Sequence, residues 1–173
     1  MNNISIEGFS KTGNWYKGNL HCHSTNSDGK LSPKEVVELF KNNGYSFLCF
    51  SDHDIYTDYR SEFDCKDFII LPGLEASVSL FDESGKYRLK AHHIHGILGT
   101  AEMEKNAENK FEHLQRREVK IYYGDWEGKK TAQELCDEMK SYGMITTYNH
   151  PIWSRVSYNE FCDIEGIWAL EIF

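Results

Sequence analysis

Short apolar runs alternate with polar segments along this chain, and their spacing predicts an α/β fold. Residues 45–50 and 68–71 are continuous apolar runs, which are typical of strands buried on both faces. Ahead of the first run, residues 32–35 (Ser-Pro-Lys-Glu) form a capping box with proline at the first helical position. Apolar residues then recur at helical spacing as far as Gly44, which is typical of a helix end. A strand before this helix and another after it would form a βαβ unit with parallel strands.

The second half of the chain continues this alternation. Residues 131–143 combine a second capping box at Thr131 with a one-sided apolar face and a final glycine, and predict a helix. Residues 101–117 are polar and predict a helical insertion in which no side chain clearly carries chemistry. Further strands are expected over residues 76–80, 87–98, 144–148 and 166–173, and a short helix over residues 157–163.

Side chains that bind metals follow these apolar runs. His21 and His23 are two residues apart, so in an extended chain they point to the same face, and the next loop can bring Asp28 toward them. His53 and Glu75 follow the next two strands. The set is completed by His150 and by a cluster of three histidines, His92, His93 and His95.

Imidazole and carboxylate groups at the carboxyl ends of parallel strands meet at one edge of a sheet, where α/β folds place their sites. This donor set suits Zn, Mn or Fe, and its size indicates more than one ion, bridged by a carboxylate. For any single residue, a packing or capping role is the alternative.

Composition narrows the class of protein. The chain has 173 residues, of which 40% are hydrophobic and 27% charged, and predicts one globular domain over residues 1–173. No apolar run approaches a membrane span, and residues 1–11 have neither the basic start nor the apolar core of a signal peptide, which favours the cytoplasm. The five cysteines include no Cys-x-x-Cys pair and predict reduced thiols.

The net charge of −8 disfavours binding to a nucleic-acid polymer, because there is little attraction to a phosphate backbone. It leaves a small phosphorylated substrate open, because carboxylates that hold metals lie in a locally cationic site. The oligomeric state stays open.

The order of the motifs resembles a known family. His-x-His-x4-Asp-Gly is followed by Ser-Asp-His-Asp, Gly-Leu-Glu, a histidine-rich strand, Asn-His-Pro and Leu-Glu-Ile over residues 15–173. This order is similar to that of the PHP family, the polymerase and histidinol phosphatase domain. The segments at residues 15–21 and 150–154 resemble the branch of metal-dependent phosphoesterases, which merges into metallohydrolases similar to carbaryl hydrolase.

The resemblance implies a distorted (β/α)7 barrel that holds two or three divalent metal ions, Zn, Mn or Fe. His21 and His23 would bind the first ion, and Glu75 would bridge the first and second. The second ion would also take His150 and one histidine of the cluster. We expect His93 in that role and His95 next, since they share a face, with His92 opposite. Asp28 and His53 would hold the third ion.

The implied function is a metal-dependent phosphoesterase. A metal-activated water would attack the phosphorus of a small phosphate ester or short nucleotide. The metal ligands would form the catalytic set, and Arg155 would bind a phosphate oxygen, unless it is simply an exposed, salt-bridged arginine. The alternatives are a carboxylester or carbamate hydrolase on the same ions, and a catalytically incomplete metal-binding domain.

The chain departs from the family at its end. The family pattern includes an Asp-x-His near the C-terminus, and none follows His150. A β/α barrel also usually needs roughly 200 residues or more. The chain is therefore expected to be an N-terminal portion of a PHP-like domain that lacks the last strands and ligands, with open sheet edges and weakened hydrolysis.

Overall fold

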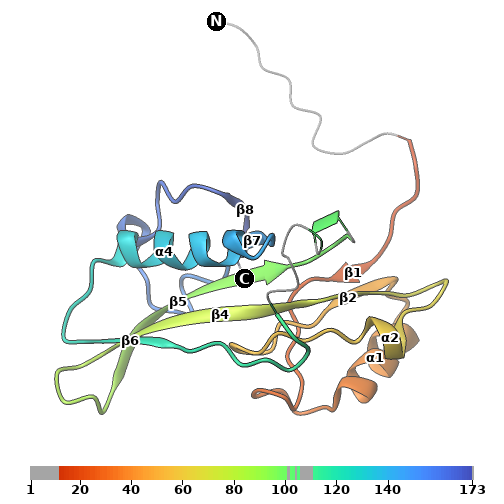
Figure 1. The fold of residues 1–173 in the computed structure, drawn as a ribbon, viewed down its shortest axis with the longest axis horizontal. Helices are drawn as coiled ribbons and strands as arrows, with labels where there is room; N and C mark the ends of the chain where they lie inside the picture. The colour runs from red at the N-terminus through yellow and green to blue at the C-terminus, as the bar shows by residue number, and fades with distance from the viewer. Residues whose placement is uncertain (1–11, 101, 104, 106–110, 173) are drawn as a thin grey trace, which may run out of the picture.

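Two β-sheets and their helices make up the fold (Figure 1). The computed structural model describes residues 12–100, 102–103, 105 and 111–172. The first sheet is parallel, in the order β1 (Gly18–Asn19), β2 (Phe47–Cys49) and β3 (Ile69–Leu71). The second sheet has the order β6 (Lys120–Tyr123), β4 (Gly73–Phe81), β5 (Arg88–Ile97), β7 (Ile145–Tyr148) and β8 (Ile167–Leu170). The mixed α/β class with parallel strands is confirmed.

The first sheet contains the βαβ unit that the sequence predicts. Helix α1 (Pro33–Asn42) begins with a reciprocal capping box, in which Ser32 and Glu35 each accept a hydrogen bond from the backbone N–H of the other. Its buried face packs on β2, β3 and their flanking residues, and this core consists of Val36, Val37, Leu48, Phe50, Tyr59, Phe68 and Ile70. The short helix α2 (Arg60–Phe63), which the sequence pattern did not predict, lies beside β3.

The second sheet has its own core under helix α4 (Gly128–Ser141). The helix runs along β4, β5 and β7 in Figure 1. Its one-sided apolar stripe, which includes Leu135 and Met139, is buried against Leu74 and Ile94 of the sheet. No helix in the part of the chain that the structure describes is long and apolar enough to cross a bilayer.

Three predicted helices differ from the structure in their bounds. Helix α4 begins at Gly128 rather than at Thr131, which is a buried position within the helix and caps nothing. In the helical insertion expected over 101–117, residues 102, 103 and 105 are helical as predicted, residues 101, 104 and 106–110 lie outside the described residues, and residues 111–117 form turns and a bridge instead of a helix. The short helix expected over 157–163 is a single 3-10 turn, η1 (Tyr158–Glu160).

The strands assigned in the described residues do not close into the expected barrel. A barrel of that type needs a helical crossover between every pair of strands, whereas β4 and β5 are joined by a tight turn and are therefore antiparallel. Asp82 holds this turn by accepting hydrogen bonds from the backbone N–H groups of Lys86 and Tyr87. The two sheets meet at an isolated parallel bridge between His53 and Glu75.

His92 belongs to the core beneath α4. Its ring stacks on Trp126 with centroids 4.4 Å apart, and its Nδ1 lies 2.5 Å from the hydroxyl oxygen of Tyr148. Burial lowers the pKa of His92 to about 4. This histidine therefore remains neutral in the folded chain at pH 7.

We predict that His92 destabilises the fold in acid. Its pKa in the unfolded chain is near 6.5, so below that pH the unfolded state takes up the proton first and stability falls as pH drops toward 4. Between pH 7 and pH 4.5 the free energy of unfolding should fall by about 2 kcal/mol less in His92→Phe than in the unmodified chain. Urea unfolding at the two pH values measures the difference, and equal losses in the two proteins would contradict the prediction.

Candidate metal centre

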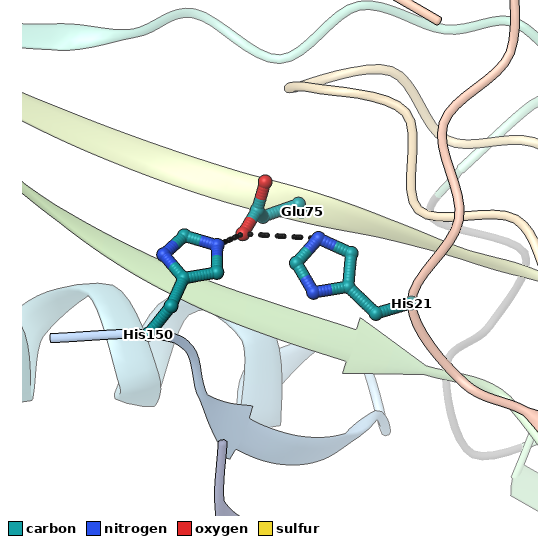
Figure 2. A group of neighbouring side chains, drawn as sticks. All are labelled: His21, Glu75 and His150. Carbon is teal, nitrogen blue, oxygen red and sulfur yellow. Dashed lines mark hydrogen bonds and ion pairs between the residues drawn. The ribbon is translucent and has the colours of Figure 1, made fainter. Parts of the chain in front are cut away.

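The Glu75 side chain lies at the centre of a group of histidines where the two sheets meet. Its carboxylate is fully buried, and its Oε1 lies 2.9 Å from His150 Nε2 and 3.4 Å from His21 Nε2 (Figure 2). Its Oε2 lies 3.0 Å from His53 Nδ1 and 3.4 Å from His23 Nε2. Glu75 is therefore shared by two clusters of potential ligands. The first consists of His21, Glu75 and His150, and the second of His23, His53 and Glu75, with the ligand atoms of each within 4.8 Å of one another.

Different loops bring these histidines together. His21 and His23 follow β1 rather than lying within it, and their Nε2 atoms are 2.9 Å apart. Between them the chain is fixed to the end of β2, since Cys22 and Ser51 exchange hydrogen bonds. His53 follows β2 and His150 follows β7, so each of these ligands comes just after a strand.

Three of the predicted metal ligands lie outside the two clusters. Asp28, 70% exposed, is at the rim, with carboxylate oxygens 3.1 Å from His23 Nδ1 and 3.6 Å from His53 Nε2. The His93 ring is buried at the site, 5.5 Å from the His53 ring and 5.1 Å from the His150 ring. His95 is farther back, where its Nε2 lies 3.4 Å from the buried thiol of Cys49.

Ser154 fixes two of the imidazoles and was not anticipated from the sequence. Its hydroxyl lies 2.9 Å from Nδ1 of His93 and 3.2 Å from Nδ1 of His150. These contacts leave the Nε2 atom of both rings for the site, and a partner on the other ring nitrogen is what orients a metal-binding histidine. Arg155, the next residue, is exposed and makes no ion pair with any residue that the structure describes.

Glu171 was also missed as a site residue. Its Oε2 lies 2.9 Å from His21 Nδ1, so His21 stands between this carboxylate and that of Glu75. Glu171 directly follows β8, so the rule that identified Glu75 from its position after a strand would have identified this residue too.

Two buried aspartates hold the loops that carry the histidines. Asp52 accepts hydrogen bonds from the backbone and hydroxyl of Ser24 and from the hydroxyl of Ser27, which fixes the loop after His23. Asp54 has φ of +53°, accepts two hydrogen bonds from Ser77, and pairs with Arg117 at 3.0 Å. These contacts fix the backbone on both sides of His53.

The electrostatics of the cluster favour a bound cation. Burial would raise the pKa of Glu75, but hydrogen bonds from His150, His21 and His53 lower it well below its usual range. Burial works against the charged form of His21, yet the Glu75 and Glu171 carboxylates raise its pKa to about 9. In the metal-free chain a proton therefore supplies the positive charge that a divalent ion would bring.

The donor set fits a metal ion. Glu75 Oε2 is buried and has His53 Nδ1 at 3.0 Å and His23 Nε2 at 3.4 Å, but neither contact is a well-directed hydrogen bond, which leaves a lone pair of this oxygen for a metal ion. Burial lowers the pKa of His93 to about 4 and that of His95 to about 3, so both rings are neutral, as a ligand must be. Imidazole nitrogens with one bridging carboxylate suit Zn, Mn or Fe.

Comparison with known proteins identifies the family to which the chain belongs. A family model for the PHP domain matches residues 19–148, and the chain belongs to that family. The resemblance inferred from the order of motifs is thus confirmed at the level of the family, while the carbaryl-hydrolase branch is not.

Two curated proteins share short segments with the chain. A 5'-3' exoribonuclease of Haemophilus influenzae is 53% identical over 38 residues, which cover 22% of this chain and 14% of that protein. The DNA polymerase/3'-5' exonuclease PolX of Bacillus subtilis is 45% identical over 40 residues, which cover 23% of this chain and 7% of that protein. The matched segments thus span only a small part of either relative.

Among solved structures, one similar chain is a two-domain protein of Bacteroides vulgatus ATCC 8482, described as containing a predicted PHP-like metal-dependent phosphoesterase. The TM-score is 0.42 and the identity 14%, over 88% of this chain and 38% of the other.

We predict that Arg117 is essential to the stability of the site. Its side chain is 7% exposed and forms ion pairs with both Asp54 and Glu138. Replacing it in Arg117→Met leaves Asp54 buried without its cation, and removing one partner of a buried pair costs about 3–5 kcal/mol.

The matched control for this substitution is Lys120→Met, which breaks an ion pair with Glu134 whose side chains are 56% and 47% exposed. Chemical denaturation should show a large loss of unfolding free energy for Arg117→Met and no measurable change for the control. Similar losses of unfolding free energy in the two variants would show that the buried ion pairs of Arg117 contribute no more to stability than an exposed ion pair.

Proposed function

We propose that this chain is a metal-dependent phosphoesterase that hydrolyses small phosphate esters. The observation that carries the proposal is the buried Glu75 carboxylate, shared between the His21–His150 and His23–His53 pairs. A carboxylate between two groups of imidazoles is an arrangement that supports a pair of ions about 3.5–4 Å apart. Divalent ions bound there would lower the pKa of water and neutralise charge on phosphoryl oxygens.

The proposed ligand sets differ in part from those that the resemblance implies. We assign His21 and His150 to one ion, His23 and His53 to the other, and Glu75 to both. The Nε2 atoms of His21 and His23 are only 2.9 Å apart, so one ion bound by both histidines, as the resemblance implies, is the alternative to this assignment. Asp28 lies beside His23 and His53 and would add a carboxylate on their exposed side, where a third ion would bind.

The supporting residues have defined tasks in this proposal. Ser154 would hold His93 and His150 by Nδ1, and Glu171 would hold His21 by Nδ1, so that each ring offers Nε2. His93 is neutral and buried beside the cluster, and its free Nε2 is available either to a metal or to a proton of the substrate. Arg155 would attract the phosphate from the rim.

Phosphate esters are the favoured substrate class because both curated relatives are named as exonucleases, and exonucleases hydrolyse phosphate diesters. We propose small esters or short nucleotides rather than polymers, because the net charge of −8 opposes binding to a long phosphate backbone. The metal, its stoichiometry and the activity are all part of the proposal.

Substrate discrimination tests the reaction class. The chain, supplied in turn with Zn, Mn or Fe, should release nitrophenol from 4-nitrophenyl phosphate, and chelation should abolish this release. Turnover of 4-nitrophenyl acetate or an aryl carbamate with no turnover of the phosphate would assign the site to carboxylic esters instead. Metal binding without turnover of any of the three esters would indicate a metal-binding domain.

We predict that metal ions stabilise the chain through Glu75. At a free metal concentration of 100 times the dissociation constant, stability should rise by about 2.7 kcal/mol, which corresponds to a rise of roughly 5–11 °C in Tm for a chain of this size. Glu75→Gln keeps the shape and removes the charge, so it should abolish the shift and lower the rate of hydrolysis by more than about 100-fold.

The matched control is Glu134→Gln on the exposed face of α4, which should retain both the shift and the activity. Calorimetry with and without metal measures the shift. An unchanged metal response in Glu75→Gln would show that the metal binds elsewhere.

A further inference from the structure

A cavity of about 710 Å³ lies next to the candidate metal centre. His93 and His150 line both the cavity and the cluster of histidines around Glu75, so the two spaces adjoin. The volume falls within the range of about 300–1,000 Å³ that holds small ligands. A substrate whose phosphate reaches the histidines would therefore place the rest of its structure in this cavity.

Positive charge lines the cavity of an otherwise acidic chain. Arg88 and Arg155 both line it, and neither forms an ion pair with a residue in the described part of the chain. The third cation of the lining, Lys90, is already paired with Glu160 at 2.8 Å. Two guanidinium groups are thus free to bind an anion by paired hydrogen bonds.

A β-bulge directs Arg88 toward the site. In the pairing of β4 with β5, Leu80 lies opposite Lys90, and the next residue, Phe81, lies opposite Arg88. Leu89 is therefore the extra residue of a bulge in β5. Such a bulge reverses the alternation of side chains and re-aims a residue at a strand end. Burial lowers the pKa of His93, and the charge of Arg88 adds to this effect, which is consistent with their closeness.

The other wall of the cavity comes from the loop after His150. Trp153 is 80% exposed there and lies two residues before Arg155 in the sequence, while Ser154 between them is buried against His93. The loop is well fixed, because Ser154 donates its N–H to His150 O and accepts a hydrogen bond from Ala91 N on β5. Large exposed aromatic side chains in fixed positions favour stacking with flat ligands.

The loop also carries backbone strain. The non-glycine residues His150 and Arg155 have φ angles of +23° and +60°. Such conformations cost roughly 1–3 kcal/mol and are typical of functional sites, where they aim a side chain. Here the strained residues are a ligand of the proposed metal centre and a free cation of the adjoining cavity.

From these features we propose that the cavity binds the alcohol portion of the substrate, and that this portion combines a flat apolar ring with a second negatively charged group. The ring would pack on Trp153, and the second anion would bind Arg88 and Arg155. This inference rests on the proposed phosphoesterase function for the orientation of the substrate, but the binding preference itself can be measured without catalysis.

Binding of inert phosphonates tests the proposal. Isothermal titration should show that 4-carboxyphenylphosphonate binds at least 10-fold more tightly than phenylphosphonate, because only the former carries the second anion. Replacing the carboxylate by a second phosphonate should preserve the preference, and replacing it by an aminomethyl cation should reverse it. Equal affinities for phenylphosphonate and the carboxylate compound would overturn the proposal.

Variants locate the binding determinants. Arg88→Met should reduce the preference for the second anion to about 2-fold or less, whereas Lys130→Met, an exposed lysine on α4, should retain it. Trp153→Ala should reduce binding of phenylphosphonate relative to methylphosphonate by about 10-fold, and Trp153→Phe should restore most of the difference. An unchanged preference in Arg88→Met would overturn the assignment of the cavity.

The two proposals fail in different ways. If the chain hydrolyses no phosphate ester but binds the carboxylate compound preferentially through Arg88, the phosphoesterase function is wrong and the cavity assignment stands. If it hydrolyses phenyl phosphate and binds both phosphonates equally, the function stands and the assignment of the second anion is wrong.

Discussion

The buried carboxylate of Glu75 is the constraint on which the rest of the site depends. A fully buried negative charge is costly unless it is paired and hydrogen-bonded, and this one is surrounded by His21, His23, His53 and His150. These histidines come from loops far apart in the sequence. The backbone bridge between His53 and Glu75 joins the two sheets at the same point, so the fold and the site meet at one residue.

Around Glu75, buried polar side chains form hydrogen bonds that fix the loops carrying the histidines. Asp52 fixes the loop after His23, Asp54 and Arg117 fix the segment around His53, and Ser154 fixes His93 and His150. Partners of this kind set the orientation of metal ligands before any ion arrives. The same rigid loop after β7 presents Trp153 toward the cavity, which couples the proposed recognition of the substrate to the proposed metal centre.

Local sequence signals predicted much of the fold and the site. The capping box at Ser32 located α1, and the position of histidines and Glu75 after apolar runs located the cluster, because both depend on short stretches of chain. The predicted start of α4 was wrong because Thr131 has the side chain of a capping residue but is buried within the helix, and its burial depends on tertiary packing. The strands of the described residues do not form the barrel that the resemblance implied, because the turn at Asp82 pairs β4 and β5 as an antiparallel hairpin where such a barrel has a helical crossover.

The residues that were missed act over long sequence separations. Glu171 contacts His21 across 150 positions, and Arg117 contacts Asp54 across 63. The position of Glu171 after a strand could have marked it as a candidate. Which partner each of these two side chains contacts, however, depends on the completed arrangement of the two sheets.

The most direct test of the account is to locate metal ions by anomalous diffraction, with data above and below the absorption edge, from crystals of the chain grown with manganese or zinc. We predict two anomalous peaks that share Glu75, one in contact with His21 and His150 and the other with His23 and His53. A structure at saturating metal in which no ion touches Glu75, and the histidines keep their present contacts with it, would contradict the central claim that this buried carboxylate is a metal bridge.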